Sequence, residues 1–391
     1  MLESMLGVSD CLFVVGRPPQ VEAYGRLCPV DIPQFMPVLQ PTHTKAIAER
    51  LMGESERLRN DFRNTGSCDT SYAVPNIARF RVNIFRQNGN YAVVMRKLTN
   101  EVPSIDQLKL PQILKDVSRE KNGIILITGA TGNGKTTSLA AILNEVNQVA
   151  DVHVVTLEDP IEFLHTHKRA TFSQRELGKD FLDFATGLRA ALRQAPKIIL
   201  VGEIRDRETM EIALTAAETG HTVYATLHTI SASLSINRII GFFSKDEEAY
   251  VRQRLSDVLR YIISQRLMPK IGGGRILATE IMGSNLRTKE AVLLGESDLR
   301  DLHEIIEASH QFGWHSFEQC LIDYYRDQRI SEDTAMSYSV NKPAMRKAID
   351  LAKKEMTQQE DGLTGLRLNL TDLHIGPGQF APITMPTDEK K

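Results

Sequence analysis

The sequence predicts an α/β protein in which a small α+β domain precedes a larger domain with a mostly parallel sheet and a helical C-terminal part. From about Leu114, short apolar runs alternate with segments of helical spacing, the pattern of a sheet covered by helices on both faces. Before that point a strand–turn–strand pattern is present, and a glycine-rich loop follows the first apolar run. A length of 391 residues exceeds one ordinary core, so several domains are expected.

The N-terminal unit spans residues 1–98. Apolar residues at helical spacing between positions 47 and 62 predict helix, and alternation over residues 79–84 predicts a strand with arginines on its polar face. Residues 87–90, Gln-Asn-Gly-Asn, have the chemistry of a hairpin turn, and residues 91–95 form the return strand. The sequence therefore predicts a hairpin with a polar, arginine-bearing face.

A linker is predicted at residues 99–111, which contain prolines at both 103 and 111. The core of the larger domain is expected over residues 112–285, and polar residues cluster just after its apolar runs. In open α/β sheets the ligand crevice lies beyond the carboxyl ends of the strands. The expected strands are Ile124–Ile127, Val152–Leu157, Ile198–Val201 and Val223–Leu227.

The C-terminal part is expected to be mainly helical. Residues 247–267 have apolar side chains at helical spacing and predict one core-facing helix. A helical region is expected over residues 286–356. From residue 357 to 391 the chain is rich in Gly, Pro and polar residues, which predicts a flexible tail. A leucine alternation at residues 366–370 suggests that this tail docks on a partner protein.

The composition narrows the function classes. A hydrophobic content of 42% and a charged content of 25% are those of a soluble globular protein. The formal net charge of −2 provides no basic field for nucleic acid. No run of about 18 apolar residues predicts a membrane span, and the acidic start does not resemble a signal peptide. Four scattered cysteines without a C-x-x-C pair indicate reduced thiols in a cytosolic protein.

The strongest motif is a complete P-loop that follows an apolar strand and opens a helix. Its glycines let backbone N–H groups wrap phosphates, and the helix N-terminus adds positive potential. Lys135 is expected to reach the β and γ phosphates of ATP, and Thr136 to bind Mg²⁺. The predicted nucleotide-binding residues are Gly129, Ala130, Thr131, Gly132, Asn133, Gly134, Lys135, Thr136 and Thr137.

Two acidic segments follow the P-loop. Residues 156–162, TLEDPIE, deliver three carboxylates at the end of a strand, and one of them could orient or deprotonate the attacking water. Residues 198–203 consist of four apolar residues, a glycine and Glu203. This is a Walker B pattern in which Glu203 occupies the position usually held by Asp. Glu203 is expected to hold Mg²⁺ through water.

Histidines and arginines complete the candidate site. His221 and His228 bracket one apolar run; His228 is placed to sense the γ-phosphate, whereas His221 fits a structural role equally well. His165 and His167 are interpreted as a surface turn. An arginine from a neighbouring domain or subunit is expected to contact the phosphates. The candidates, which the spacing does not rank, are Arg79, Arg81, Arg96, Arg189, Arg193 and Arg205.

Taken together, these motifs resemble secretion ATPases of the PilT type. The matching phrases are ARFRVN, TLEDPIEFLH, RQAP, VGEIRD, TAAETGHTVYATLHT and IGGGR, and the resemblance extends from about residue 9 to about residue 355. Within the family, GATGNGKT, LKLPQILK and HSFEQCLIDYYRDQRISEDTAMSYS are similar to the accessory retraction ATPases of the PilU type. Residues 286–297 read LRTKEAVLLGES where the PilT type carries an AIRNLIRE helix, which favours an accessory role.

The resemblance implies a PAS-like N-terminal domain and a RecA-like ATPase domain assembled in a homohexamer. It implies catalysis by Glu162, a Walker B role for Glu203, a His box at His221 and His228, and arginine fingers at Arg81 and Arg96. The cofactors would be ATP and Mg²⁺. The ring would act on the cytoplasmic side of the inner membrane, docked on a pilus platform protein, with a PilT paralogue as a candidate partner and without membrane insertion.

Four rival interpretations remain. A type II secretion or pilus-extension ATPase commonly carries a tetracysteine zinc module, which the dispersed cysteines do not supply. A type IVB secretion ATPase shares the same motifs and is not excluded. A nucleic-acid translocase is disfavoured by the near-zero net charge, and a non-catalytic nucleotide-binding scaffold by the intact Lys135, Glu162 and Glu203.

Overall fold

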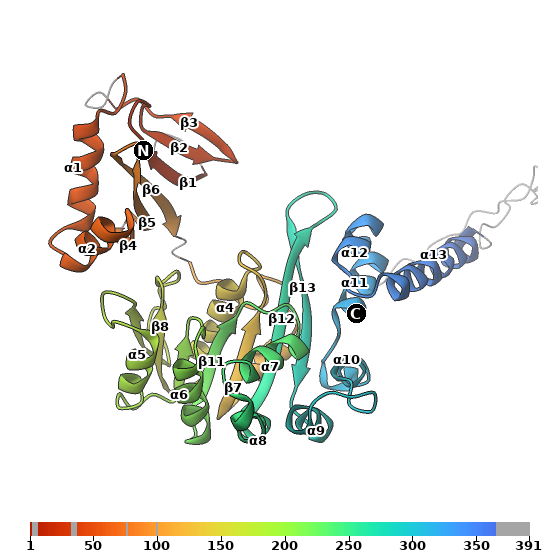
Figure 1. Cartoon of the computed structure of the whole chain (residues 1–391). Coiled ribbons are helices and arrows are strands. Elements are labelled where there is room, and N and C mark those ends of the chain that lie inside the picture. The colour runs from red at the N-terminus through yellow and green to blue at the C-terminus, as the bar shows by residue number, and fades with distance from the viewer. Residues whose placement is uncertain (2–6, 33–36, 76, 99–100, 365–391) are drawn as a thin grey trace, which may run out of the picture.

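A computed structural model describes residue 1 and residues 7–32, 37–75, 77–98 and 101–364 of the chain. It contains two sheets (Figure 1). One hydrophobic cluster packs on the first sheet, and two pack on the faces of the second. A six-stranded sheet belongs to the N-terminal domain and a seven-stranded sheet to the ATPase domain. The fold is therefore an α+β domain followed by an α/β domain, as the sequence predicts.

The N-terminal domain is an antiparallel sheet with two helices packed on it. Its strand order is β3-β2-β1-β6-β5-β4, and the predicted hairpin is β5 and β6, joined through Asn88 and Gly89, both with positive φ. The predicted helical stretch divides at Gly53 into two helices. The elements are β1 (Val8–Phe13), β2 (Gln20–Ala23), β3 (Arg26–Pro29), α1 (Pro41–Met52), α2 (Glu56–Thr65), β4 (Ser67–Val74), β5 (Ala78–Gln87) and β6 (Asn90–Leu98).

The larger sheet has the order β13-β12-β7-β11-β10-β8-β9, and all its neighbours are parallel except the β12–β13 pair. Successive residues of β7 alternate between two cores, Ile124 and Leu126 on one face and Ile125 and Ile127 on the other. This two-sided burial explains the unbroken apolar runs. The strands are β7 (Gly123–Thr128), β8 (His153–Glu158), β9 (Thr171–Glu176), β10 (Ile198–Val201), β11 (Thr222–Leu227), β12 (Leu259–Pro269) and β13 (Arg275–Gly283).

Helices cover both faces of this sheet. Side chains of α4 and the buried Ile105 and Leu110 form the core on one face, so part of the segment predicted as a linker packs into the larger domain. The helices of this domain are α3 (Ile113–Val117), α4 (Lys135–Val149), α5 (Phe184–Ala191), α6 (Arg207–Glu218), α7 (Ala232–Ile240) and α8 (Glu248–Val258), with a 3-10 turn, η2 (Lys245–Glu247), before the last.

The single helix predicted over residues 247–267 is wrong. Helix α8 ends at Val258, and β12 continues from Leu259 between β7 and β13. The apolar residues in Leu259–Ile263 fit helical spacing, but their backbone pairs with two distant strands, which a short apolar run cannot reveal. Residues 275–283 likewise form a strand, β13, that the sequence does not predict.

The C-terminal part is helical, and its last described helix runs beyond residue 356. Residues 357–364 belong to α13, whereas the rest of the predicted tail, with its leucine alternation, lies outside the described residues. Within the described chain, no helix is long and apolar enough to cross a membrane. The elements are α9 (Leu286–Leu294), α10 (Leu302–Glu307), η3 (His310–Phe312), α11 (Phe317–Arg326), α12 (Glu332–Tyr338) and α13 (Lys342–Thr364).

Candidate active site

A cavity of about 510 Å³ lies at the carboxyl ends of the central strands of the larger sheet. It brings together the P-loop, the acidic segment after β8, the acid after β10 and one arginine of the N-terminal domain. Among the predicted site residues, its walls include Thr131, Gly132, Gly134, Lys135, Thr136, Thr137, Glu162, Glu203, His228, Arg81 and Arg205.

The P-loop is shaped by its glycines and by its contact with β12. Gly129, Gly132 and Gly134 all have positive φ, the region that side chains disfavour. A Cβ on Gly129 would lie 2.6 Å from the Gln265 carbonyl oxygen, so the loop begins tight against β12. The Asn133 amide donates to that same carbonyl at 3.0 Å and accepts from the Leu267 N–H at 3.3 Å. Asn133 thus anchors the loop to the strand.

Lys135 is held inside its own loop. Its ammonium donates to the carbonyl oxygens of Gly129 at 2.7 Å and Ala130 at 3.2 Å, and the residue is buried. Burial lowers the pKa of Lys135, while Glu203 and Glu162 raise it. The cation therefore faces both predicted catalytic carboxylates, and it is placed where phosphate oxygens would replace the loop carbonyls as acceptors.

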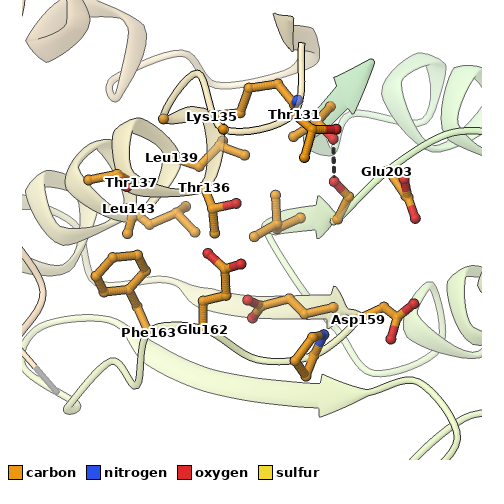
Figure 2. Close-up of a pocket in the computed structure, with 18 of the residues that line it drawn as sticks. Thr131, Lys135, Thr136, Thr137, Leu139, Leu143, Asp159, Glu162, Phe163 and Glu203 are labelled. Atoms are coloured by element: carbon orange, nitrogen blue, oxygen red, sulfur yellow. Dashed lines mark hydrogen bonds between the residues drawn. The ribbon is translucent and has the colours of Figure 1, made fainter. Parts of the chain in front are cut away.

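Glu162 and Glu203 lie in the segments that follow two different strands, β8 and β10. Figure 2 shows the Glu162 carboxylate directed toward Thr136, with Phe163 beside it facing Leu143. Glu203 is paired with Arg205 at 2.5 Å and lies 3.3 Å from Nε2 of His228. The residue before Glu203 must be small, because a Cβ on Gly202 would lie 2.9 Å from the Leu157 carbonyl oxygen of β8. Gly202 therefore lets the backbone that carries Glu203 pack closely against β8.

Thr136 and Glu203 suit a magnesium site. Mg²⁺ prefers oxygen ligands and in nucleotide sites takes most of them from phosphates and water, so one hydroxyl and one carboxylate are sufficient from the protein. Both residues line the cavity. When bound, the ion would neutralise charge on the phosphates.

Glu158 differs from Glu162 and Glu203 in the burial of its carboxyl group. It is almost fully buried and accepts hydrogen bonds from Thr156 at 2.6 Å and from Gln174 at 3.1 Å, both at the same oxygen. Burial raises the pKa of Glu158 to about 7 against these two hydrogen bonds. A buried carboxyl that is half protonated near neutral pH is a poor candidate for a permanently charged phosphate or metal contact.

The raised pKa of Glu158 predicts a pH-dependent stability. The native state keeps its proton up to about pH 7, whereas the unfolded chain releases it near pH 4.5, so this group makes stability fall as pH rises between those values. Replacing Glu158 with Gln, which mimics the protonated form, should stabilise the protein at pH 8 by about 3 kcal/mol and not at pH 4. Thermal or urea unfolding at both pH values measures this, and an equal effect at the two values would contradict it.

Three aromatic residues line the cavity wall, Phe163, His165 and Phe184, and none of them is among the predicted site residues. The surface turn predicted at His165 and His167 is wrong for His165. Its ring stacks on Phe172 at 4.5 Å, and burial lowers its pKa to about 4, so it is neutral at pH 7. Because the stacking partner lies on β9, local sequence gives no signal of it. His167 is exposed, and its ring accepts from the Phe172 N–H.

The other predicted residues lie elsewhere. The Arg96 guanidinium pairs with Asp10 at 2.9 Å, and its side chain is 70% exposed. Arg189 pairs with Glu208, and Arg193 is exposed. The His221 ring contacts the Ala216 carbonyl and the Thr219 hydroxyl, a local role at the end of α6. None of these four residues is among those that line the cavity.

Comparison with known proteins identifies a common family. Residues 39–361 match the model described as type II/IV secretion system protein. Two similar relatives come from Pseudomonas aeruginosa. The type IV pilus retractation ATPase PilT is 39% identical over 84% of this chain and 93% of its own length, and the type IV pilus ATPase PilU is 35% identical over 94% of each.

A solved structure agrees with this family assignment. A crystal structure of the pilus retraction motor PilT with bound ADP has a TM-score of 0.79 and 38% identity, and the match covers 88% of this chain and 96% of that chain.

Proposed function

The chain belongs to the type II/IV secretion system protein family, among its PilT-type ATPases, and we propose that it hydrolyses ATP to power the retraction of type IV pili. One observation carries the proposal. A single cavity is lined by the P-loop, by Glu162 and Glu203, and by Arg81 from the other domain. This arrangement supports a motor in which hydrolysis depends on the relative position of the two domains.

In the proposed mechanism each group has one role. Lys135 and the loop N–H groups hold the β and γ phosphates, and Glu162 takes a proton from the attacking water. Thr136 and Glu203 would hold Mg²⁺, which would neutralise charge on the phosphates. His228, beside Glu203, senses the γ-phosphate.

The proposed domain limits remain those predicted, namely N-terminal domain 1–98, linker 99–111, ATPase core 112–285, helical region 286–356 and tail 357–391, except that Ile105 and Leu110 pack into the larger domain and residues 357–364 continue α13. The tail is proposed to dock on the partner motor.

Arg81 is proposed to contact the γ-phosphate from within the same chain. Replacing Arg81 with Ala removes a charged hydrogen-bond donor and should lower kcat about tenfold. Steady-state ATPase assays measure this, with Arg81→Lys, which keeps the charge, as the matched control. Arg96→Ala is the comparison, because Arg96 pairs with Asp10 and lies opposite Arg81 across the hairpin. A larger loss in Arg96→Ala would transfer the finger role to Arg96.

We further propose a homohexamer at the cytoplasmic face of the inner membrane that acts on a pilus platform protein as a PilU-like accessory to a PilT paralogue. The PilU alignment, which covers 94% of both chains, supports this assignment. Fluorescence imaging of labelled pili in a deletion strain, with and without the PilT paralogue, tests it. The accessory proposal expects weaker retraction under load when only this chain is lost. Normal retraction together with a secretion defect would instead favour a type IVB or type II secretion role.

A further inference from the structure

Ile161, the residue before Glu162, is held by hydrogen bonds at both its N–H and its carbonyl. Arg79, on β5 of the N-terminal domain, donates to the Ile161 carbonyl at 2.6 Å. The N–H of Ile161 makes a long hydrogen bond, 3.5 Å, to the carboxylate of Glu176 at the end of β9. Ile161 immediately precedes Glu162, so the orientation of Glu162 depends on one anchor from each domain.

Glu176 also connects the two domains directly. Its side chain is only 7% exposed, and it accepts from the hydroxyl of Ser71 at 2.8 and 3.1 Å to its two oxygens. Lys179 pairs with the same carboxylate at 2.8 Å and donates to both the carbonyl and the hydroxyl of Ser71. A buried carboxylate is destabilising unless it is paired and hydrogen-bonded, so undocking the N-terminal domain would remove a needed partner.

A second contact brings the domains close at the same place. Arg57, on α2, donates to the Gly178 carbonyl at 3.1 Å. Gly178 has φ +76°, and a Cβ there would lie 2.5 Å from the guanidinium carbon of Arg57. The N-terminal domain therefore rests on the segment that begins at Glu176, next to the anchor of Ile161.

The guanidinium of Arg79 is fixed in this contact. Its Nη1 atom is buried without a hydrogen-bond partner, and burial lowers the pKa of Arg79 while Glu176 and Glu158 raise it. Burial of an unpartnered donor is unfavourable, and such groups call for a functional explanation. Arg79 is not among the residues that line the nucleotide cavity, so a direct phosphate contact does not explain its burial. The hydrogen bond from its Nη2 atom to the Ile161 carbonyl offers an explanation.

We propose that Arg79, Ser71 and Glu176 form an interdomain bracket that positions Glu162, so that hydrolysis, but not ATP binding, requires the N-terminal domain to be docked on β9. These three residues are positioning residues, and they act on Glu162 through the backbone carbonyl and N–H of Ile161. The inference rests on the proposed role of Glu162 as the catalytic base.

The test uses the full chain with Ser71→Ala. This change removes one hydrogen bond to the Glu176 carboxylate, so kcat should fall about tenfold. KM for ATP and the Kd for a fluorescent ATP analogue should not change. Ser71→Thr keeps the hydroxyl and should restore most of the rate. Ser9→Ala, which removes a hydroxyl that donates to the Glu22 carbonyl within the N-terminal sheet, is the matched control and should leave kcat unchanged.

Arg79→Met provides the second arm. It should lower kcat by up to about 100-fold, the effect of a catalytic group displaced by about 1 Å, again without a change in Kd. A wild-type kcat in Ser71→Ala overturns the bracket, as does an equal loss in Ser71→Ala and Ser71→Thr. An ATP affinity that weakens as much as the rate in Arg79→Met also overturns it, because Arg79 would then be a nucleotide contact.

The bracket and the proposed catalytic base can fail separately. If Glu162→Gln stops turnover but Ser71→Ala and Arg79→Met do not, only the bracket is wrong. If Glu162→Gln retains turnover, the assignment of the base is wrong whatever the bracket variants do.

Discussion

Replacing Lys135 with Ala is expected to abolish tight ATP binding. The Lys135 ammonium already lies buried in the loop, held by two carbonyl oxygens that phosphates would replace. Each hydrogen bond to a charged group contributes about 1.5–3 kcal/mol, so the loss of two such contacts should weaken binding by at least about 100-fold. Without the cation, Glu162 and Glu203 would also repel the phosphates.

Titration of a fluorescent ATP analogue measures this effect. Lys197→Ala is the matched control, because Lys197 is exposed and its ammonium donates to a single carbonyl, that of Gly220. Its affinity should equal that of the wild type. An unchanged affinity in Lys135→Ala would refute the assignment of the phosphate site.

Replacing Glu162 with Gln is expected to leave ATP bound but unhydrolysed. The amide keeps the size of the side chain and its hydrogen bonding but cannot accept the proton of the attacking water. Loss of a positioned general base lowers the rate by about 10²–10⁴-fold. Lys135 is unchanged in this variant, so the affinity for ATP should remain.

Single-turnover hydrolysis and the Kd for ATP, measured on the same preparation, separate the two steps. Glu158→Gln is the informative control, because Glu158 is buried on the same segment and accepts both of its hydrogen bonds at one oxygen, which Gln can also do. It should retain most of the rate. If Glu158→Gln stops turnover and Glu162→Gln does not, the catalytic role belongs to Glu158.

The four central strands of the ATPase domain and the position of the P-loop could be predicted because they depend on local patterns. An apolar strand, a glycine-rich loop and a helix follow one another within residues 123–149, and the structure forms that unit. The family membership, the fold class and the ATPase activity predicted from the motifs are confirmed by the comparisons.

The errors occurred where distant segments determine the structure. Residues 259–269 are a strand because β7 and β13 flank them, although their apolar spacing also fits a helix. Strands β2 and β3 have four residues each, too short for a periodic signal. The stacking of His165 on Phe172 and the contact of Arg79 with Ile161 depend on tertiary packing, which no local spacing encodes.

A structure of the full chain with a non-hydrolysable ATP analogue and Mg²⁺ tests the central claim most directly. The account predicts the γ-phosphate against Lys135, Mg²⁺ beside Thr136, and the carboxylate of Glu162 within hydrogen-bond distance of the water in line with the γ-phosphate. Arg81 of the same chain should contact the γ-phosphate, with Arg79 still bound to the Ile161 carbonyl. A nucleotide bound outside this cavity, or a Glu162 carboxylate directed away from the γ-phosphate, would contradict it.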